Sequence, residues 1–197
     1  SAKAYEVDVV LFFNKNDIYN AETLLYQDEL KKVYSEIGYQ CFVFSALNDS
    51  MSRVKTILKN KNNLISGHSG VGKSTLINKL LSSDKIATKE ISASHNQGQH
   101  TTTFSELYRL RFGGTIIDTP GIKGFGLVDI DINRLDSYFP EIFKYKKECK
   151  YNNCMHKNEP SCSVKDAVGN GLINKNRYAN YLSMLASEKS IYRTKNH

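Results

Sequence analysis

The chain has 197 residues, enough for one large hydrophobic core and a small appended domain. Its hydrophobic content of 40% excludes a disordered chain, and no apolar run approaches the roughly 20 residues that span a bilayer. The net charge of +7 favours a polyanionic partner, nucleic acid before membrane. No secretory leader opens the sequence, so we expect a cytoplasmic protein with reduced cysteines and no membrane partner.

Strand and helix patterns alternate through the first 120 residues. Apolar runs predict strands at residues 7–13, 40–44 and 63–66, and helical periodicity predicts helices at 23–37, 51–59 and 73–81. An alternating run at 106–112, a Gly113-Gly114 turn and a run at 115–118 predict a hairpin. The repeated strand–loop–helix order predicts a doubly wound α/β sheet. Beyond about residue 140 the composition shifts to Lys, Asn and Cys, so we place a domain boundary there, before helices near 164–168 and 176–188.

A glycine-rich loop joins the predicted strand at 63–66 to the predicted helix at 73–81. In a loop of this spacing, backbone N–H groups surround the phosphates, Lys73 bridges the β- and γ-phosphates, and Ser74 ligates Mg²⁺. The flanking strand and helix distinguish it from a chance glycine turn. The expected nucleotide-binding residues here are Gly67, His68, Ser69, Gly70, Val71, Gly72, Lys73, Ser74 and Thr75.

Two earlier motifs predict that the base is guanine. An Asn-Lys-x-Asp run follows the first strand, and its Asp17 can accept from both N1–H and N2–H₂ of guanine, a pair that adenine lacks. Alone, this tetrapeptide could equally be an exposed turn. The next strand ends in Ser-Ala-Leu, whose backbone can support the guanine O6. Together the motifs predict that GTP and GDP are bound by Asn14, Lys15, Asp17, Ser45, Ala46 and Leu47.

The order of these motifs is informative in itself. Ordinary guanine-nucleotide switches carry the phosphate loop first and the base-reading motif late. Here the base-reading motif at residues 14–17 precedes the phosphate loop at residues 67–74. The sequence therefore has the order of a circularly permuted GTPase.

An Asp-Thr-Pro-Gly run at residues 118–121 ends the last predicted strand of this region. Asp118 is expected to hold Mg²⁺ through water, and the Gly121 N–H is expected to meet the γ-phosphate. The polar stretch at 84–104 is typical of a switch loop. From it we expect Thr102, rather than Thr101, to complete the Mg²⁺ site with Ser74 and Asp118.

The residues around these motifs also bear on hydrolysis. Ile122 stands where many switch GTPases carry the glutamine that orients water, which predicts slow intrinsic turnover. His100 is the candidate for positioning the water, because a neutral imidazole can hold one. The alternative is that His100 is a solvated loop histidine.

Cysteine and histidine gather late in the sequence, with the spacing Cys149-x₄-Cys154-x-His156-x₅-Cys162. Three thiolates and one imidazole match one tetrahedral structural Zn²⁺ with no open position for catalysis. Free thiols beside a surface histidine are the alternative. The metal would stabilise a segment that is too small to form its own hydrophobic core. Surrounding lysines, with Tyr145 between them, could grip RNA or simply form a solvated surface.

Taken together, these features resemble the RsgA (YjeQ) family of bacterial GTPases that depend on the small ribosomal subunit. The resemblance rests on the motif order, a Gly-x-His-Thr-Thr run at 98–102, an aliphatic residue after the Asp-Thr-Pro-Gly motif, and the cysteine–histidine spacing. It implies an α/β, circularly permuted P-loop GTPase domain over residues 1–140 and a small, mainly helical zinc-binding domain over 141–197. Members also carry an N-terminal OB-fold and a first GTPase strand, which we expect to be absent here.

The resemblance also implies a function and its partners. It implies a GTPase of late 30S maturation that binds the small subunit and 16S rRNA, hydrolyses GTP to GDP and phosphate when stimulated by the subunit, and couples release to hydrolysis. It implies that His100 assists hydrolysis, and we expect a monomer. The alternative is a truncated RNA- or ribosome-binding module without effective hydrolysis. A zinc-dependent enzyme is excluded because protein ligands fill all four positions.

Overall fold

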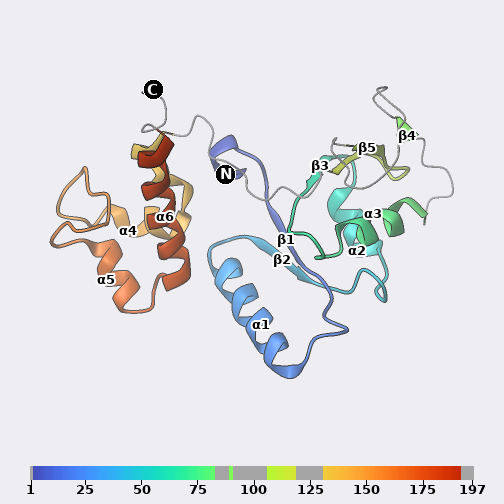
Figure 1. The fold of residues 1–197 in the computed structure, drawn as a ribbon, viewed down its shortest axis with the longest axis horizontal. Coiled ribbons are helices and arrows are strands. Elements are labelled where there is room, and N and C mark those ends of the chain that lie inside the picture. The colour runs from blue at the N-terminus through green and yellow to red at the C-terminus, as the bar shows by residue number, and fades with distance from the viewer. Residues whose placement is uncertain (1, 83–88, 91–105, 119–130, 192–197) are drawn as a thin grey trace. The chain divides into compact units, whose positions relative to one another are not determined.

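The computed structural model describes residues 2–82, 89–90, 106–118 and 131–191, with only the backbone at 89–90 and 187–191. Its elements are η1 (Ala2–Tyr5), β1 (Val10–Phe13), α1 (Ala21–Glu36), β2 (Gln40–Val43), α2 (Ser52–Leu58), β3 (Asn62–Ile65), α3 (Lys73–Ser82), β4 (Lys89–Glu90), β5 (Glu106–Arg109), β6 (Thr115–Asp118), η2 (Ile132–Tyr138), α4 (Pro140–Lys146), α5 (Ser163–Gly169) and α6 (Lys175–Ile191) (Figure 1). None of the described helices is both long and apolar enough to cross a membrane.

The chain divides into two compact units. We call the first the sheet unit, which comprises Leu11–Lys31 and Cys41–Phe125. We call the second the helical unit, which comprises Ser1–Val10, Lys32–Gln40 and Gly126–His197.

The described strands form two sheets instead of the single doubly wound sheet that the sequence predicts. β1 pairs with β2, and the other sheet has the order β3–β6–β5–β4. Strands β3 and β6 are parallel, whereas β5 is antiparallel to both of its neighbours. Between β2 and β3 the chain forms α2. Among the described strands, none pairs with members of both sheets. The predicted alternation of strands and helices is confirmed (Figure 1).

One hydrophobic core serves both sheets of the sheet unit. Helices α2 and α3 each bury side chains spaced three or four residues apart, which is the signature of one apolar helix face. Residues that follow β2 or lie in β6 pack into the same cluster, so the two sheets share a single core. The cluster includes Phe44, Met51, Val54, Leu58, Leu76, Ile77, Leu80 and Ile116.

The connection between β5 and β6 is longer than the two-glycine turn that the sequence predicts. β5 ends at Arg109, because Leu110 already belongs to the turn: its N–H donates to the Gly114 carbonyl at 3.0 Å. Gly113 and Gly114 both have φ of +92°, and a Cβ on Gly114 would overlap the backbone of Lys61. This turn therefore requires glycine.

Helix α1 follows the base-reading motif directly. Asn20 caps its first turn, because the Asn20 Oδ1 accepts the Thr23 N–H at 2.9 Å, so the helix begins two residues before the predicted start. Gly38 has φ of +105°, and the Tyr39 N–H returns to the Tyr34 carbonyl at 3.0 Å. The predicted glycine stop is thus confirmed.

The helical unit has its own core, to which η2, α4, α5 and α6 contribute. The helices predicted near 164–168 and 176–188 are confirmed as α5 and α6. Two of the four predicted metal ligands are themselves core residues. The boundary at residue 140 stays a prediction; η2, just before it, packs into this core. The buried apolar members of the cluster are Leu135, Phe139, Ile142, Val164, Ala167, Ile173, Tyr181 and Leu185, beside Cys154 and Cys162.

Candidate functional site

The phosphate-loop residues lie between β3 and α3, as the sequence predicts. Lys73 is the first residue of α3, and its Nζ folds back to donate to the carbonyls of Gly67, at 2.6 Å, and His68, at 2.9 Å. The ammonium group therefore lies inside the curve of the loop. The free N–H groups at the start of α3 add a positive end to the same place, which suits an anion.

Asn14 ties the base-reading motif to the phosphate loop. Its Nδ2 donates to the Val71 carbonyl at 2.9 Å, and its Oδ1 accepts the Ala46 N–H at 2.8 Å. One side chain thus connects three segments that are 25 or more positions apart in the sequence. The approach is so close that a Cβ on Gly72 would overlap the Asn14 amide. The convergence of the early and late motifs, which sequence alone could only predict, is present in the fold.

A second set of residues, which the sequence reasoning missed, orders the loop after β2. The Asn48 Nδ2 donates to Oδ2 of Asp17 at 3.0 Å, and so orients the carboxylate expected to read guanine. The Asp49 carboxylate accepts the Ser45 N–H at 2.8 Å. Lys79 of α3 donates to the carbonyls of Leu47 and Asp49, at 2.6 and 2.9 Å. Asn48 and Asp49 directly follow the Ser-Ala-Leu motif and could have been suspected, whereas nothing in the sequence marked Lys79.

Exposure divides the predicted nucleotide-binding residues into two groups. Ser45 and Ala46 are buried, and their N–H groups donate to the side chains of Asp49 and Asn14. Others have solvent-exposed surfaces, as a ligand site open to solution requires; they are Asp17, Leu47, His68, Ser69, Gly70, Val71 and Ser74. Asn14, Lys15, Gly67, Gly72, Lys73 and Thr75 are half-buried, and Lys15 has a φ of +72°, a strained value for a residue with a Cβ.

Asp118 ends β6 beside the phosphate loop. It stands opposite Ile65, the last residue of β3, in the parallel register. Burial raises the pKa of the Asp118 carboxyl; the nearby Lys73 ammonium opposes this rise and Glu106 adds to it. The carboxyl and the lysine are thus electrostatic neighbours, as a site for Mg²⁺ and phosphate needs. The predicted residues His100, Thr102 and Gly121 lie outside the described residues.

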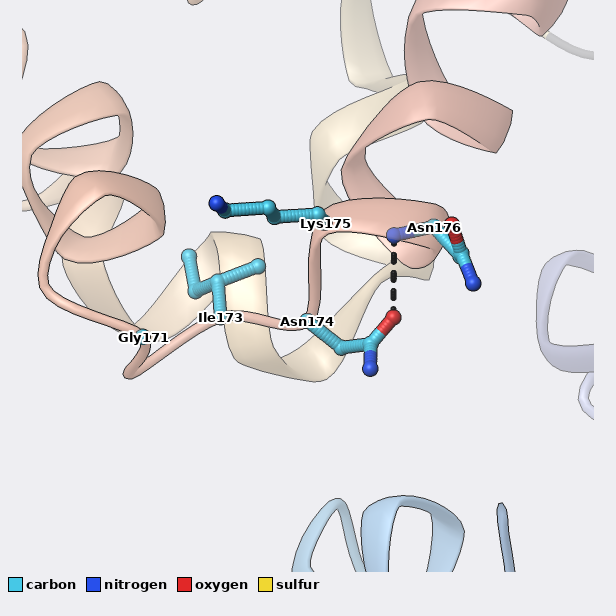
Figure 2. Close-up of a pocket in the computed structure, with 5 residues that line it drawn as sticks. All are labelled: Gly171, Ile173, Asn174, Lys175 and Asn176. Carbon is cyan, nitrogen blue, oxygen red and sulfur yellow. Dashed lines mark hydrogen bonds between the residues drawn. The ribbon is translucent and has the colours of Figure 1, made fainter. Parts of the chain in front are cut away.

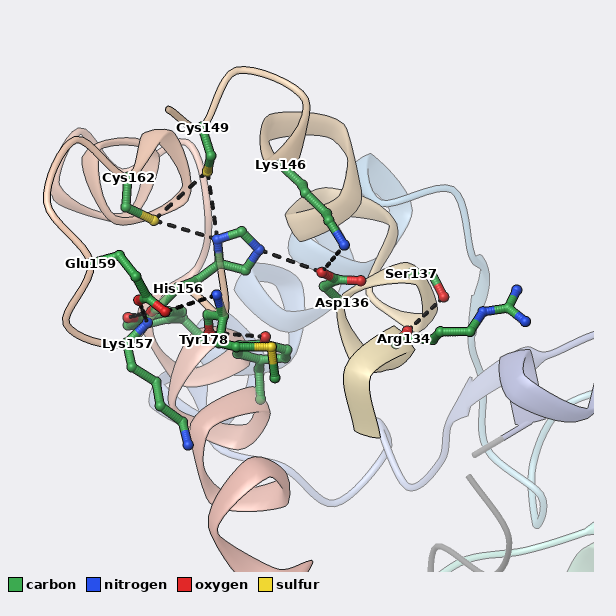
Figure 3. A network of polar contacts seen from close by, with 12 residues as sticks. Arg134, Asp136, Ser137, Lys146, Cys149, His156, Lys157, Glu159, Cys162 and Tyr178 are labelled. Carbon is green, nitrogen blue, oxygen red and sulfur yellow. Dashed lines mark hydrogen bonds and ion pairs between the residues drawn. The ribbon is translucent and has the colours of Figure 1, made fainter. Parts of the chain in front are cut away.

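The four predicted zinc ligands converge in the helical unit. One ligand atom from each of Cys149, Cys154, His156 and Cys162 lies within 4.8 Å of the others. Figure 3 shows three of these residues, Cys149, His156 and Cys162. Three of the four residues are buried.

The spacing of these atoms suits a tetrahedral ion. Bonds of about 2.3 Å to sulfur and about 2.0 Å to nitrogen require about 3.8 Å between two sulfurs and about 3.5 Å between sulfur and nitrogen. The Sγ atoms of Cys149 and Cys162 are 3.9 Å apart. They lie 3.6 and 3.4 Å from Nδ1 of His156. The donor set and its geometry therefore fit zinc.

The electrostatics of the cluster also favour a cation. Burial raises the pKa of Cys154 to about 12 and raises that of Cys162, because thiolates are costly in an apolar surrounding. Burial likewise lowers the pKa of His156, which keeps its imidazole neutral. A bound dication would reverse the penalty for the thiolates, so protein and metal charges would compensate each other.

The structure adds a charged pair that the sequence did not reveal. Oδ2 of Asp136 lies 3.6 Å from Nε2 of His156 and 2.5 Å from Nζ of Lys146 (Figure 3). Asp136 precedes the first cysteine by thirteen residues, and no local spacing links it to the cluster. In the fold, η2, which carries Asp136, packs against α4 and α6.

A small pocket lies before α6, away from the predicted residues. Gly171, Ile173, Asn174, Lys175 and Asn176 line it (Figure 2). The Asn174 Oδ1 caps the helix, because it accepts the Asn176 N–H at 2.9 Å. This oxygen is therefore already used within the helix cap.

Comparisons with known proteins agree with this geometry. The family model of the RsgA GTPase matches residues 1–128. The chain is 50% identical over 195 residues to the small ribosomal subunit biogenesis GTPase RsgA of Flavobacterium psychrophilum, covering 98% of this chain and 60% of that protein. It is 52% identical over 190 residues to a protein of the same name, RsgA 2, from Bacteroides thetaiotaomicron, covering 96% and 61%.

Two solved structures are similar as well. The crystal structure of YjeQ from Thermotoga maritima is 33% identical, with a TM-score of 0.75, and the match covers 94% of this chain and 62% of that one. YloQ, described as a circularly permuted GTPase, is 27% identical, with a TM-score of 0.74 and coverage of 96% and 60%. The chain thus spans about three fifths of the length of the curated relatives it matches. With a family model matched over residues 1–128 and the motif order of a permuted GTPase, the chain belongs to the RsgA GTPase family.

Proposed function

We propose that the chain binds guanine nucleotides with Mg²⁺ and hydrolyses GTP to GDP and phosphate. The observation that carries the proposal is the double hydrogen bond of Asn14, which joins the base-reading motif, the Ser-Ala-Leu loop and the phosphate loop. A nucleotide of this class has a base at one end and phosphates at the other. The three segments supply donors and acceptors for both ends at one place.

Each predicted residue has a role in this proposal. Asp17 accepts from the guanine N1–H and N2–H₂, while the backbone of the Ser-Ala-Leu loop supports O6 and the stem of Lys15 covers the ring. Lys73 and the backbone of residues 67–75 hold the phosphates. Ser74, Thr102 and Asp118 hold Mg²⁺. His100 positions the attacking water, and the Gly121 N–H meets the γ-phosphate.

We also propose that one structural Zn²⁺ occupies the cluster of Cys149, Cys154, His156 and Cys162. The support is the spacing of the ligand atoms and the burial of three of the four residues. Protein donors fill a tetrahedral coordination shell, so the ion would stabilise the helical unit and would not take part in hydrolysis.

The proposed partner is the 30S ribosomal subunit with its 16S rRNA, during late maturation of the subunit. The support is that the relatives are named for biogenesis of the small ribosomal subunit. Lysines of the helical unit lie over aromatic rings: Lys147 over Phe143 at 5.8 Å and Lys150 over Tyr151 at 5.5 Å. Phe143 and Tyr151 are both about two fifths exposed, so charge and stacking surface face solvent together, as RNA binding requires. This partner implies a cytoplasmic protein, and we propose that it acts as a monomer.

The nucleotide proposal is tested with the full chain and a fluorescent GDP analogue, displaced by unlabelled GDP or ADP. GDP should compete and ADP should not. The matched variant is Asp17→Asn, which exchanges an acceptor for a donor. Its preference should move from guanine to xanthine nucleotides, because xanthine has an oxygen at C2 in place of the amino group. Equal competition by ADP would refute guanine recognition.

Hydrolysis and its stimulation need a separate experiment. Phosphate release from GTP is measured with and without 30S particles, and the subunit should accelerate it. Equal rates would refute ribosomal stimulation. A folded chain that binds 30S particles but neither binds nor hydrolyses GTP would instead support the alternative, a ribosome-binding module, which the exposed lysine–aromatic surface favours.

A further inference from the structure

Both ring nitrogens of the His156 imidazole face polar atoms. Nδ1 faces the sulfur atoms of Cys149 and Cys162, whereas Nε2 points the opposite way, toward Asp136 (Figure 3). His156 is 0% exposed and Asp136 is 2% exposed, so water does not compete for this approach. The 3.6 Å from Nε2 to the Asp136 Oδ2 is just beyond hydrogen-bond length. The Nε2 atom has no hydrogen-bond partner among the described residues, so a small ring rotation would complete this bond.

The charge of Asp136 is balanced by Lys146 of α4. The Lys146 Nζ lies 2.5 Å from the Asp136 Oδ2, the oxygen that faces His156. Three thiolates and a dication together carry one negative charge, and an unpaired carboxylate beside them would be repelled. The Lys146 ammonium offsets the charge of the carboxylate beside the proposed metal centre.

The backbone of His156 is held independently of the ring. His156 has φ of +58°, an uncommon conformation for a residue with a Cβ. The Tyr178 hydroxyl donates to the His156 carbonyl at 2.5 Å. The Glu159 carboxylate accepts the N–H groups of Met155 and Lys157, at 3.0 and 2.8 Å. With the main chain fixed on both sides, the rotation of the imidazole is the freedom that remains.

We propose that Asp136, neutralised by Lys146, is a positioning residue that holds the His156 imidazole for the metal. An acceptor at Nε2 keeps the proton on that nitrogen and leaves the Nδ1 lone pair free to bind the ion. This inference rests on the proposed zinc centre. It also makes η2, which carries Asp136, part of the metal centre, although none of the four ligands lies in that element.

The test compares two carboxylate-to-amide variants of the full chain. Asp136→Asn keeps the side-chain shape and one acceptor oxygen but loses the charge. Glu141→Gln is the matched control, because Glu141 forms another largely buried ion pair of the helical unit, with Arg177 at 2.7 Å. Zinc dissociation constants are measured by competition with a chromophoric chelator, and the Co²⁺-loaded proteins are compared by their absorption spectra. Loss of a residue that hydrogen-bonds a metal ligand without binding the metal itself typically weakens metal binding about 10- to 100-fold.

The expected result is weaker zinc binding and an altered Co²⁺ spectrum for Asp136→Asn alone. Wild-type affinity in Asp136→Asn, or an equal loss in Glu141→Gln, would overturn the inference. A second measurement uses the wild-type protein only: nitrogen-15 spectra of zinc-loaded chain should show His156 metallated at Nδ1 and protonated at Nε2. The opposite tautomer would also overturn it. Failure of the wild-type protein to bind zinc at all would instead refute the proposed metal centre.

Discussion

Gly72 offers a test of the junction between the phosphate loop and the base-reading motif. Gly72 has φ of +95°, which costs a residue with a Cβ about 1–2 kcal/mol. The Cβ of Gly72→Ala would also overlap the Nδ2 of Asn14. That amide can move aside only by giving up its bonds to Val71 and Ala46, each worth about 0.5–1.5 kcal/mol. The total expected loss is about 2–5 kcal/mol.

Gly70 is the matched control in the same loop. It has φ of +80°, but a Cβ there would meet nothing within 4 Å. Gly70→Ala therefore carries the backbone strain of about 1–2 kcal/mol without the clash. The difference between the two variants, about 1–3 kcal/mol, isolates the contribution of Asn14.

The assay is urea unfolding of both variants in the absence of nucleotide, followed by titration with fluorescent GDP. Gly72→Ala should unfold at the lower urea concentration. It should also bind GDP more weakly than Gly70→Ala, because the base-reading motif loses its link to the phosphate loop. A factor of ten in affinity corresponds to about 1.4 kcal/mol. Equal stability of the two variants would refute the reasoning that Asn14 joins these segments.

Three further predictions concern other contacts. Lys79→Met removes two charge-assisted hydrogen bonds to the loop that carries Leu47. The affinity for GDP in the same titration should therefore fall by about three- to tenfold. Unchanged affinity would mean that the loop is ordered without the lysine. Arg177→Met leaves the Glu141 carboxylate buried without its partner, so the free energy of unfolding in urea should fall by about 2–4 kcal/mol. A fall of less than about 1 kcal/mol would show that solvent reaches this pair. Because burial raises the pKa of Cys154 to about 12, its thiol is protonated at neutral pH and must release that proton to bind zinc. Zinc affinity should therefore rise with pH, and calorimetry in buffers of different ionisation enthalpy should show proton release; a pH-independent affinity would contradict thiolate ligation.

The sequence by itself predicted the residues of both proposed sites. The Gly-x₄-Gly-Lys-Ser spacing, the early Asn-Lys-x-Asp and the late cysteine–histidine cluster are local patterns. Such patterns can be read without a fold, because a loop's phosphate or metal preference is set by residues a few positions apart. The glycine at the end of α1 and the alternation of strands and helices were equally local, and both are confirmed.

Contacts between distant segments were decided only by the tertiary structure. Asn48 reaches Asp17 across 31 positions, and Lys79 reaches Leu47 across 32. Asp136 of η2 reaches His156 across 20 positions, in a unit where η2 packs against α4 and α6. The sequence predicted one sheet where the described strands form two, since hydrophobic periodicity identifies a strand but not its partner. A local pattern shows which atoms a site can use, whereas packing of the whole core determines which side chains hold those atoms in place.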